Sequence, residues 1–247
     1  MLDFLNNRRT IRRYSNQGIP PALLHQLLEA AAQSSNTGNM QTYSVVITTD
    51  MSIKEKLAPA HFNQPMVKEA PVVLSFCADF NRFSQWCKQN DAIPGYNNFE
   101  SFISAAVDAT IFAQTFAVAA ESLSLGICYL GTTTYNAQEI IDALELPPLV
   151  MPVTTITLGY PEEIPALTDR LPLEAIVHQE KYQAFTSGRI SEIYAEKEAS
   201  PLYQKFVEEN NKTTLAQVFT DIRYTQKNND FFSEKFLNAL KQQGFLA

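Results

Sequence analysis

The sequence is poor in glycine, and this shortage excludes the common phosphate-binding motifs. Only eight of its 247 residues are glycine, and no two of them are spaced as Gly-x-Gly. The Rossmann fingerprint and the P-loop both need glycines at set positions, because the backbone must approach a phosphate without a side chain in the way. We therefore expect neither motif here.

Residues that bind metals or act as nucleophiles are also few. The three histidines have no His-Glu-x-x-His spacing, and no Gly-x-Ser-x-Gly elbow occurs. The three cysteines form no Cys-x-x-Cys pair and leave an odd number, which favours reduced thiols in a cytoplasmic protein over a disulfide scaffold. If the chain is an enzyme, a bound organic cofactor is the natural carrier of its chemistry.

Positive charge is scarce overall but concentrated near the start of the chain. The net charge of −7 argues against general binding of nucleic acid or of an anionic membrane. Four of the eight arginines nevertheless lie within residues 8–13. A basic cluster on an acidic protein suggests a local anionic partner.

No segment has the pattern of an export signal or a membrane anchor. Residues 20–34 contain too many polar side chains for the apolar core of a signal peptide. Residues 102–120 are almost long enough to span a membrane, but Asp108 and Gln114 interrupt them. A helix buried inside a protein is the better interpretation, and we expect a soluble cytoplasmic protein.

The spacing of apolar residues predicts an α+β fold in a single domain, 1–247, with a core (1–175) and a helical extension (176–247). Helices and strands are mixed without a regular βαβ alternation. The predicted helices are 3–13, 20–31, 101–125, 137–144 and several after 176, and the predicted strands are 43–49, 72–77, 127–131 and 152–159.

The pentapeptide Arg8–Arg12 is the most informative short segment. On the predicted helix, Arg8 and Arg12 would lie one turn apart on the same face, with the hydroxyl of Thr10 beside them. Two guanidinium groups and a hydroxyl can hold a phosphate monoester by charge-assisted hydrogen bonds. A solvated basic helix end is the alternative, and the pentapeptide alone does not separate the two.

Longer patterns resemble the nitroreductase family. Arg-x-Thr-x-Arg-Arg-Tyr, followed by the loop Ser35–Gln41, is similar to the flavin-binding opening of its members. The chain most resembles the branch that contains the major oxygen-insensitive nitroreductase and the NADPH–flavin oxidoreductases of bacteria. Further matching stretches follow in the family's order: 76–82, 119–126, 129–131, 158–161 and 170–172.

This resemblance implies a fold, an assembly and a cofactor. The fold would be a mixed, mainly antiparallel sheet flanked by helices. The protein would be a homodimer whose C-terminal segments embrace the partner subunit, with two FMN sites built from both chains at the interface.

The resemblance also implies a role for each matching position. Arg8 and Thr10 would hold the FMN phosphate, with Arg9 beside them and Arg170 as a second arginine from a late loop. Arg12 would face the N1 and O2 edge of the flavin, where reduced flavin carries its negative charge. Further contacts with the ribityl chain and ring would come from Ser35, Asn36, Thr37, Gln64, Tyr129, Leu130 and Gly131.

The activity implied is a ping-pong transfer of hydride from NAD(P)H through FMN to a nitroaromatic, quinone or free flavin acceptor. The flavin carries the chemistry, so no catalytic side chain is expected. There are two alternatives. One is a flavin-binding or redox-sensing protein with little turnover, and the other is an enone or dehalogenase-type reductase on the same scaffold.

Some positions depart from the branch. Thr168 replaces a common lysine, and Asp169 adds a negative charge that could weaken phosphate binding. Residues 132–134 and 207–214 lack the arginines of NADPH-using relatives, so NADH is expected to serve at least as well.

Three further residues or segments have structural interpretations. We expect Cys77 to be a core residue and Asp108 to be a buried acid paired at the dimer interface. Phe83 and Trp86, in the excursion 80–100, could line the substrate site or only pack.

Overall fold

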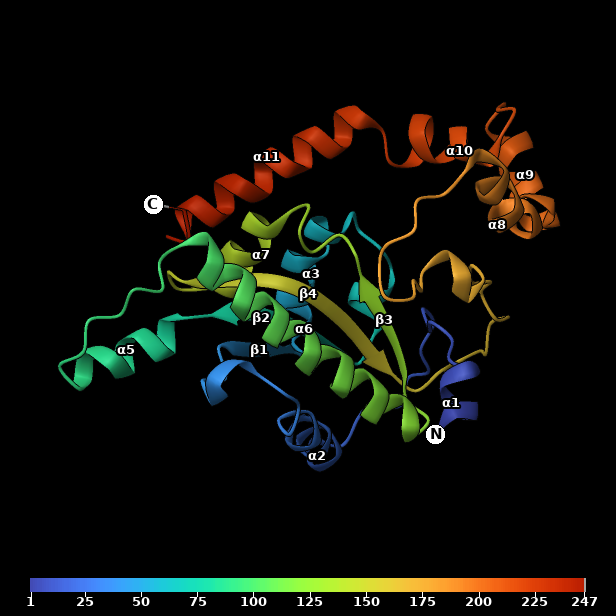
Figure 1. Ribbon diagram of the computed structural model, residues 1–247. Coiled ribbons are helices and arrows are strands. Elements are labelled where there is room, and N and C mark those ends of the chain that lie inside the picture. The colour runs from blue at the N-terminus through green and yellow to red at the C-terminus, as the bar shows by residue number, and fades with distance from the viewer. Residues whose placement is uncertain (247) are drawn as a thin grey trace. The chain divides into compact units, whose positions relative to one another are not determined.

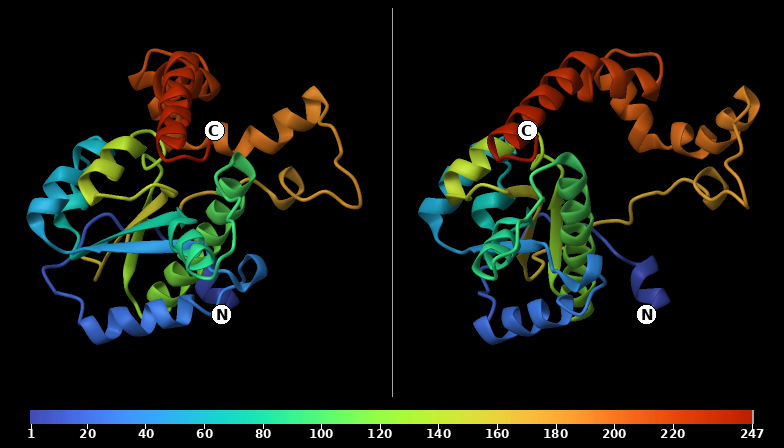
Figure 2. Two further views of the ribbon diagram at one scale, coloured as in Figure 1. Left: turned by 90° about the vertical axis from the view of Figure 1, so that its left-hand side faces the viewer. Right: turned by 60° about the vertical axis from the view of Figure 1, so that its left-hand side comes forward.

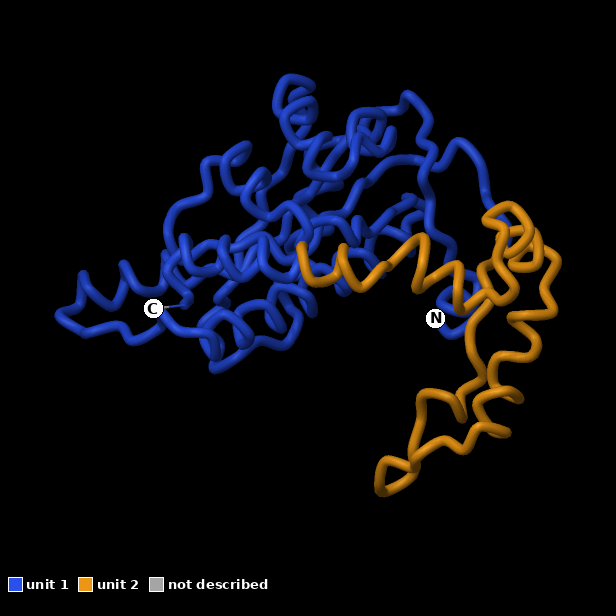
Figure 3. Tube along the Cα trace, turned by 90° about the horizontal axis from the view of Figure 1, so that it is seen from above, with its two compact units in different colours: residues 1–166, 232–247 blue, residues 167–231 orange. Residues whose placement is uncertain are grey.

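The computed structural model describes residues 1–246, and Figure 1 shows its helices and strands. The chain divides into two compact units, which Figure 3 colours separately. The first comprises residues 1–166 and 232–247, and the second residues 167–231. The organisation as a single domain stays a prediction.

The first unit is built on a four-stranded sheet. Its strands are β1 (Tyr43–Thr48), β2 (Val72–Asp79), β3 (Gly126–Leu130) and β4 (Val150–Gly159). Their order is β1-β2-β4-β3, and the three neighbouring pairs are antiparallel. The predicted α+β class is confirmed, and all four predicted strands are present.

Helices cover both faces of this sheet. Helices α2 (Pro21–Ala31) and α6 (Phe99–Ser122) pack on one face, as Figures 1 and 2 show. The shorter helices α3 (Met51–Leu57), α4 (Met66–Glu69) and α7 (Ala137–Leu144) supply the apolar side chains on the other. Because side chains alternate along a strand, Val72 and Leu74 point toward α6 while Val73 points toward α3 and α4.

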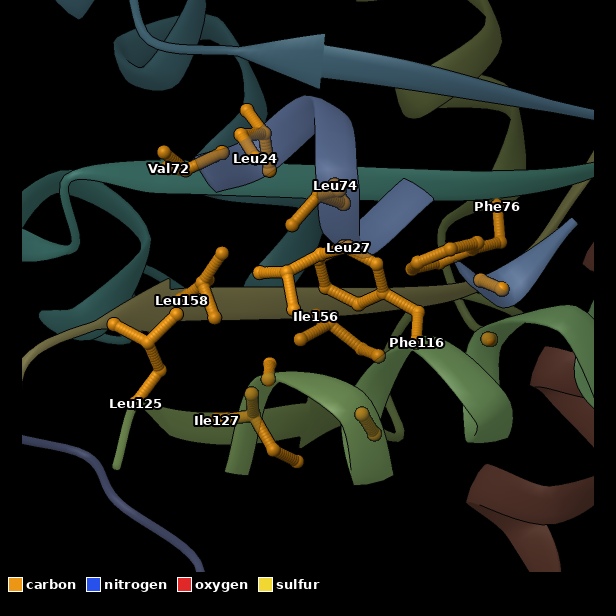
Figure 4. Close-up of a cluster of buried hydrophobic side chains, with 14 of the residues drawn as sticks. Leu24, Leu27, Val72, Leu74, Phe76, Phe116, Leu125, Ile127, Ile156 and Leu158 are labelled. Atoms are coloured by element: carbon orange, nitrogen blue, oxygen red, sulfur yellow. The ribbon is translucent and has the colours of Figure 1, made fainter. Parts of the chain in front are cut away.

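The largest apolar cluster lies between α6 and the sheet (Figure 4). Phe116 of α6 is fully buried against Phe76 of β2, with ring centroids 5.9 Å apart. Ile156 and Leu158 of β4 complete the contact. This packing explains the length and apolar character of α6.

Helix α6 is long and apolar enough to cross a membrane by length and composition alone. The side chain of Asn98 caps the N-terminus of α6 by accepting a hydrogen bond from the backbone N–H of Ser101. The helix contacts all four strands of the sheet. The sequence prediction of a helix packed within the protein is thus confirmed for its inner face. Its outer face carries an exposed apolar stripe, considered below.

The predicted helix over residues 3–13 is wrong. Helix α1 spans only Leu2–Asn6, and residues 8–13 form an irregular segment that leads to an isolated β-bridge between Tyr14 and Pro161. The backbone N–H of Ile11 donates to the carbonyl of Ile127 at 2.9 Å. Tertiary pairing with the sheet therefore overrides the local helical preference.

The excursion over residues 80–100 contains a helix that was not predicted, α5 (Asn81–Gln89). Short turns η1 (Thr37–Asn39) and η2 (Pro59–His61) flank β1 and α4. The chain after residue 170 is mainly helical, as expected, although 176–186 is not. Its elements are η3 (Leu173–Ala175), α8 (Ser187–Ala199), α9 (Pro201–Glu209), α10 (Leu215–Val218), the π-helical turn η4 (Phe219–Arg223) and α11 (Gln226–Gln242).

Candidate functional site

The arginine-rich segment docks along the ends of β3 and β4. Besides the bond from Ile11 to Ile127, the N–H of Ser15 donates to the carbonyl of Tyr160 at 2.9 Å. Gly126 makes this close approach possible, because a Cβ atom there would lie 2.6 Å from the Cβ of Ile11. The segment, residues 8–15, is called the arginine arm below.

Tyr14 anchors the far end of the arginine arm. Its hydroxyl lies 2.7 Å from Oγ1 of Thr157 and donates to the carbonyl of Ile11 at 2.8 Å. Burial raises the pKa of Tyr14, and the side-chain hydrogen bond to Thr157 opposes that rise. The phenol is therefore a neutral structural anchor.

Arg8 is held by a carboxylate that the sequence analysis did not assign. Its Nε donates to Oε2 of Glu121 on α6 at 3.0 Å, and the Glu121 side chain is only 7% exposed. Burial raises the pKa of Glu121, and the charge of Arg8 opposes the rise. With Nε engaged, the terminal nitrogens of Arg8 remain for an anion. The sequence feature that could have identified Glu121 is a single acidic residue near the end of a long apolar helix.

Arg9 lies beside Arg8 and has an unsatisfied nitrogen. Its Nη1 donates to the carbonyl of Asn7 at 2.6 Å, while its Nε is buried without a partner among residues 1–246. Arg8, Arg9 and Glu121 line a cavity of about 370 Å³. A buried guanidinium nitrogen without an acceptor beside a cavity fits an anionic ligand such as a phosphate.

Arg12 projects from the arm near the middle of β3. Burial raises the pKa of the Cys128 thiol, and the charges of Arg12 and Arg8 oppose that rise. Both guanidinium groups therefore act on the same strand. Arg12 itself is exposed, and its charge is available to a ligand on this edge.

At the C-terminal end of β3, backbone atoms are more accessible to a ligand than side chains are. The Tyr129 hydroxyl donates to Oε1 of Gln114 at 3.2 Å, and the Leu130 side chain is buried in the core. Gly131 is exposed, and a Cβ atom there would meet nothing within 4 Å. The strand end is thus open to a ligand that approaches the backbone.

A buried histidine connects this strand end to the segment that carries Gln64. The Nδ1 atom of His61 lies 2.8 Å from Oγ1 of Thr132, and the Gln64 N–H donates to the carbonyl of His61 at 3.1 Å. Burial lowers the pKa of His61 to about 4, so the ring is neutral near pH 7. Sequence reasoning missed this pair, because a lone histidine and a threonine 71 residues away form no motif.

The loop Ser35–Thr37 contacts α6 at a point far from the arginine arm. The N–H of Thr37 donates to Oδ1 of Asp108 at 2.9 Å. Asp108 and Glu121 are 13 positions apart on one helix, a separation of about 20 Å along the axis. Within one chain, the 35–37 loop and the arginine arm therefore contact α6 at points that are far apart.

Asp108 is buried, as expected from the sequence, and its carboxylate accepts hydrogen bonds from Thr37 and Thr42 of its own chain. Its place at a dimer interface stays a prediction. Cys77 is fully buried in β2, as expected for a core residue.

Arg170 belongs to the second unit. Its Nη1 donates to the carbonyl oxygens of Thr168 at 3.1 Å and Asp169 at 2.8 Å. The Asp169 carboxylate accepts from Nζ of Lys197 at 2.7 Å and from the hydroxyl of Tyr203 at 2.6 Å. These hydrogen bonds lower the pKa of Asp169. The opposing charge expected beside Arg170 is already balanced by Lys197.

Aromatic side chains gather on α5. The rings of Phe83 and Trp86 are 5.3 Å apart, and Trp86 is 58% exposed. Phe83 also contacts Tyr96 at 5.5 Å. Phe83 therefore packs within the 80–100 excursion, whereas the Trp86 side chain is exposed to solvent.

Comparisons with known proteins find relatives over most of this chain. The model of the nitroreductase family matches residues 5–160. An NAD(P)H-type FMN reductase of Bacillus subtilis is 37% identical over 180 residues, 72% of each chain. The oxygen-insensitive NADPH nitroreductase of Salmonella typhimurium is 34% identical over 182 residues, 74% of each chain.

A solved structure shares the fold over almost the whole length of the chain. A protein of Bacteroides fragilis, described only as a candidate oxidoreductase, is 57% identical with a TM-score of 0.98, covering 99% of this chain and 100% of its own. The family match, the sequence relatives and the shared α+β fold agree: this chain belongs to the nitroreductase family.

Proposed function

We propose that this chain uses FMN to carry electrons from NAD(P)H to nitroaromatics, quinones or free flavins. The general class, an FMN-dependent NAD(P)H oxidoreductase, follows from the family and from relatives such as the Bacillus subtilis FMN reductase. The observation that carries the proposal is the arginine arm. Its Arg8 and Arg9 line a cavity near the start of β3, and its Arg12 lies near the middle of the same strand.

The residues present fit FMN. The unpartnered Nε of Arg9 and the cavity beside it suit a phosphate, and the open space at Gly131 suits a planar ring that approaches the backbone. Arg8, Arg9 and Thr10 would hold the phosphate, and the expected role of Arg170 stays a prediction. When bound, FMN supplies two-electron hydride chemistry, so the chain need provide no acid or base.

The remaining positions would orient the ring. Arg12 would keep a positive charge near N1, and the 35–37 loop and Gln64 would contact its polar groups. Tyr129, Leu130 and Gly131 would present backbone to it. Turnover would be ping-pong, because NAD(P)H and the acceptor would use the same open face in turn.

The colour of the purified protein tests this function. A yellow protein should lose its flavin absorbance within seconds of adding NAD(P)H under anaerobic conditions. Nitrofurazone or a quinone should restore it. Yellow protein that never bleaches would instead favour a flavin-binding or sensing protein, and protein that cannot be loaded with FMN would refute both.

We further propose a homodimer in the cytoplasm. Helix α6 carries an exposed apolar stripe at four-residue spacing, formed by Phe99, Ile103, Val107 and Ile111. Such a stripe on a water-soluble chain favours a partner surface. The separation of the 35–37 loop from the arginine arm supports a site completed by a second chain. The three cysteines are free thiols, which suits a reducing compartment.

Val107→Asp should therefore split the dimer. Val107 is 52% exposed, and a charge buried there would be costly. We expect monomer in sedimentation velocity at micromolar concentration, weaker FMN binding, and a melting temperature that no longer depends on protein concentration. Gln26→Asp, on the exposed side of α2, is the matched control. A wild-type protein that is a folded, flavin-loaded monomer would contradict the proposal.

NADH should serve at least as well as NADPH. Preference for NADPH needs cations on its 2′-phosphate, each worth about 1.5–3 kcal/mol, or at least tenfold in affinity. Residues 132–134 are threonines, and the ammonium of Lys212 already lies 2.9 Å from Asp221. Lys205 is paired with Glu209 at 3.6 Å.

The measurement is kcat/KM for both nucleotides at one fixed acceptor concentration and low salt. A ratio near or above one for NADH is expected. An NADPH preference above about tenfold that Lys205→Ala or Lys212→Ala abolishes would overturn the argument and identify the missing cation.

A further inference from the structure

Asp108 is a buried acid whose hydrogen bonds converge on one loop. The side chain is 1% exposed, and Oδ1 accepts from the N–H of Thr37 at 2.9 Å and from its hydroxyl at 3.0 Å. Oδ2 accepts from the hydroxyl of Thr42 at 3.0 Å. A buried carboxylate is tolerated only when donors surround it. Here those donors tie the segment 37–42 to α6.

These bonds use up the donors of Thr37. Both its N–H and its hydroxyl hydrogen are directed at Asp108, and its Oγ1 also accepts from the Ser104 hydroxyl at 3.2 Å. Thr37 therefore has no hydrogen left to donate to a ligand.

The neighbouring residues of the loop differ in this respect. Oδ1 of Asn36 accepts from the N–H of Gln41 at 3.2 Å, so this side chain is partly engaged within the loop. Ser35 is exposed, and its side chain makes no hydrogen bond among residues 1–246. The Asn36 amide also donates to the carbonyl of Ser34 at 3.5 Å, so of the three side chains Ser35 is the one whose hydrogen-bonding groups are all left for a ligand.

We propose that Asp108 is a positioning residue for FMN binding and that Thr37 acts through Asp108, not on the flavin. Asp108 fixes the backbone at Thr37, and this places Ser35 two residues earlier as the direct contact. The proposal rests on the assignment of the 35–37 loop to the FMN site.

The test measures the Kd of flavin-free protein for FMN by quenching of flavin fluorescence. Ser35→Ala should raise the Kd by about threefold to tenfold, the loss of one hydrogen bond. Thr37→Val, which removes the hydroxyl bond to Asp108, should raise it comparably. Thr37→Ser, which retains that bond, should restore most of the affinity.

The double variant separates positioning from direct contact. If Thr37 acts by placing Ser35, Ser35→Ala with Thr37→Val should bind FMN no more weakly than Ser35→Ala alone. If Thr37 touches the flavin itself, the two losses will multiply and the proposal is wrong. Asp108→Asn should raise the Kd for FMN as Thr37→Val does. The test does not require the Asp108→Asn variant to fold, because the Ser35 and Thr37 variants decide it.

Thr42→Val is the control for general loosening. It removes the other hydroxyl donor to Asp108 while leaving both bonds from Thr37. It should lower the melting temperature of the flavin-free protein as Thr37→Val does, with an unchanged Kd. An equal rise in Kd for Thr42→Val would show that the loop is only destabilised, and would overturn the proposal.

The outcomes also distinguish failure of the underlying assignment. If Ser35→Ala and Thr37→Val both bind FMN as the wild type does, the loop is not part of the site. If Ser35→Ala weakens binding and Thr37→Val does not, the loop assignment stands and the role of Asp108 is refuted.

Discussion

Arg12→Ala is expected to lower the reduction potential of bound FMN by roughly 30–65 mV and to slow its reduction by NAD(P)H about tenfold to a hundredfold. The variant should fold normally, because Arg12 is exposed and belongs to no ion pair among residues 1–246. The effect arises because reduced flavin carries its negative charge at N1. A nearby guanidinium stabilises that charge by about 1.5–3 kcal/mol.

Arg13→Ala is the matched control for this experiment. Arg13 is the next residue of the arm, but its partner is the exposed Glu163 at 3.6 Å. Its loss should leave the potential unchanged. Arg12→Lys should retain part of the wild-type potential. Equilibrium dye titration gives the potentials, and stopped-flow absorbance gives the rates. An unchanged potential in Arg12→Ala would show that Arg12 does not face N1.

Gly126→Ala is expected to destabilise the protein by about 1–3 kcal/mol and to weaken FMN binding at the same time. The new Cβ would lie 2.6 Å from the Cβ of Ile11 and 2.7 Å from both of its γ-carbons. The Cβ of Ile11 is bonded directly to the backbone and cannot rotate away, and its two γ-carbons restrict rotation about the Cα–Cβ bond. The arginine arm would have to move off β3, and its guanidinium groups would move with it.

Gly18→Ala provides the comparison, because a Cβ atom at Gly18 meets nothing within 4 Å. It should be neutral or slightly stabilising, since alanine restricts the unfolded chain more than glycine does. Urea unfolding gives the change in the free energy of unfolding, and fluorescence titration gives the Kd for FMN. Normal stability and affinity in Gly126→Ala would mean that the arm is not seated against β3.

The regular elements of the core could be predicted because their patterns are local. The alternation along β4 and the apolar spacing of α2 follow from strand and helix geometry alone. The arm could not be predicted in this way. Its arginines have good helical propensity, but the bonds of Ile11 to Ile127 and of Tyr14 to Thr157 join residues far apart in the sequence. Helix α5 was missed because its apolar content is low.

The same distinction between local patterns and long-range contacts applies to the candidate site. Residue types and order identified the arginine cluster, the 35–37 loop and the β3 end as one family's pattern, because those motifs are contiguous in the chain. Charge pairing was not visible in the sequence. Only the fold brings Glu121 to Arg8 and Asp108 to Thr37, and within the second unit Lys197 to Asp169.

The sequence by itself determined the α+β class, the family and the chemical character of the site, since these depend on composition, periodicity and contiguous motifs. The tertiary structure decided which side chains are already engaged and which remain free. Thr37 donates both its hydrogens to Asp108, whereas Ser35 and the outer nitrogens of Arg8 stay available. The physical reason is that a hydrogen bond depends on distance in space, and residues such as Arg8 and Glu121, 113 positions apart, are joined only by folding.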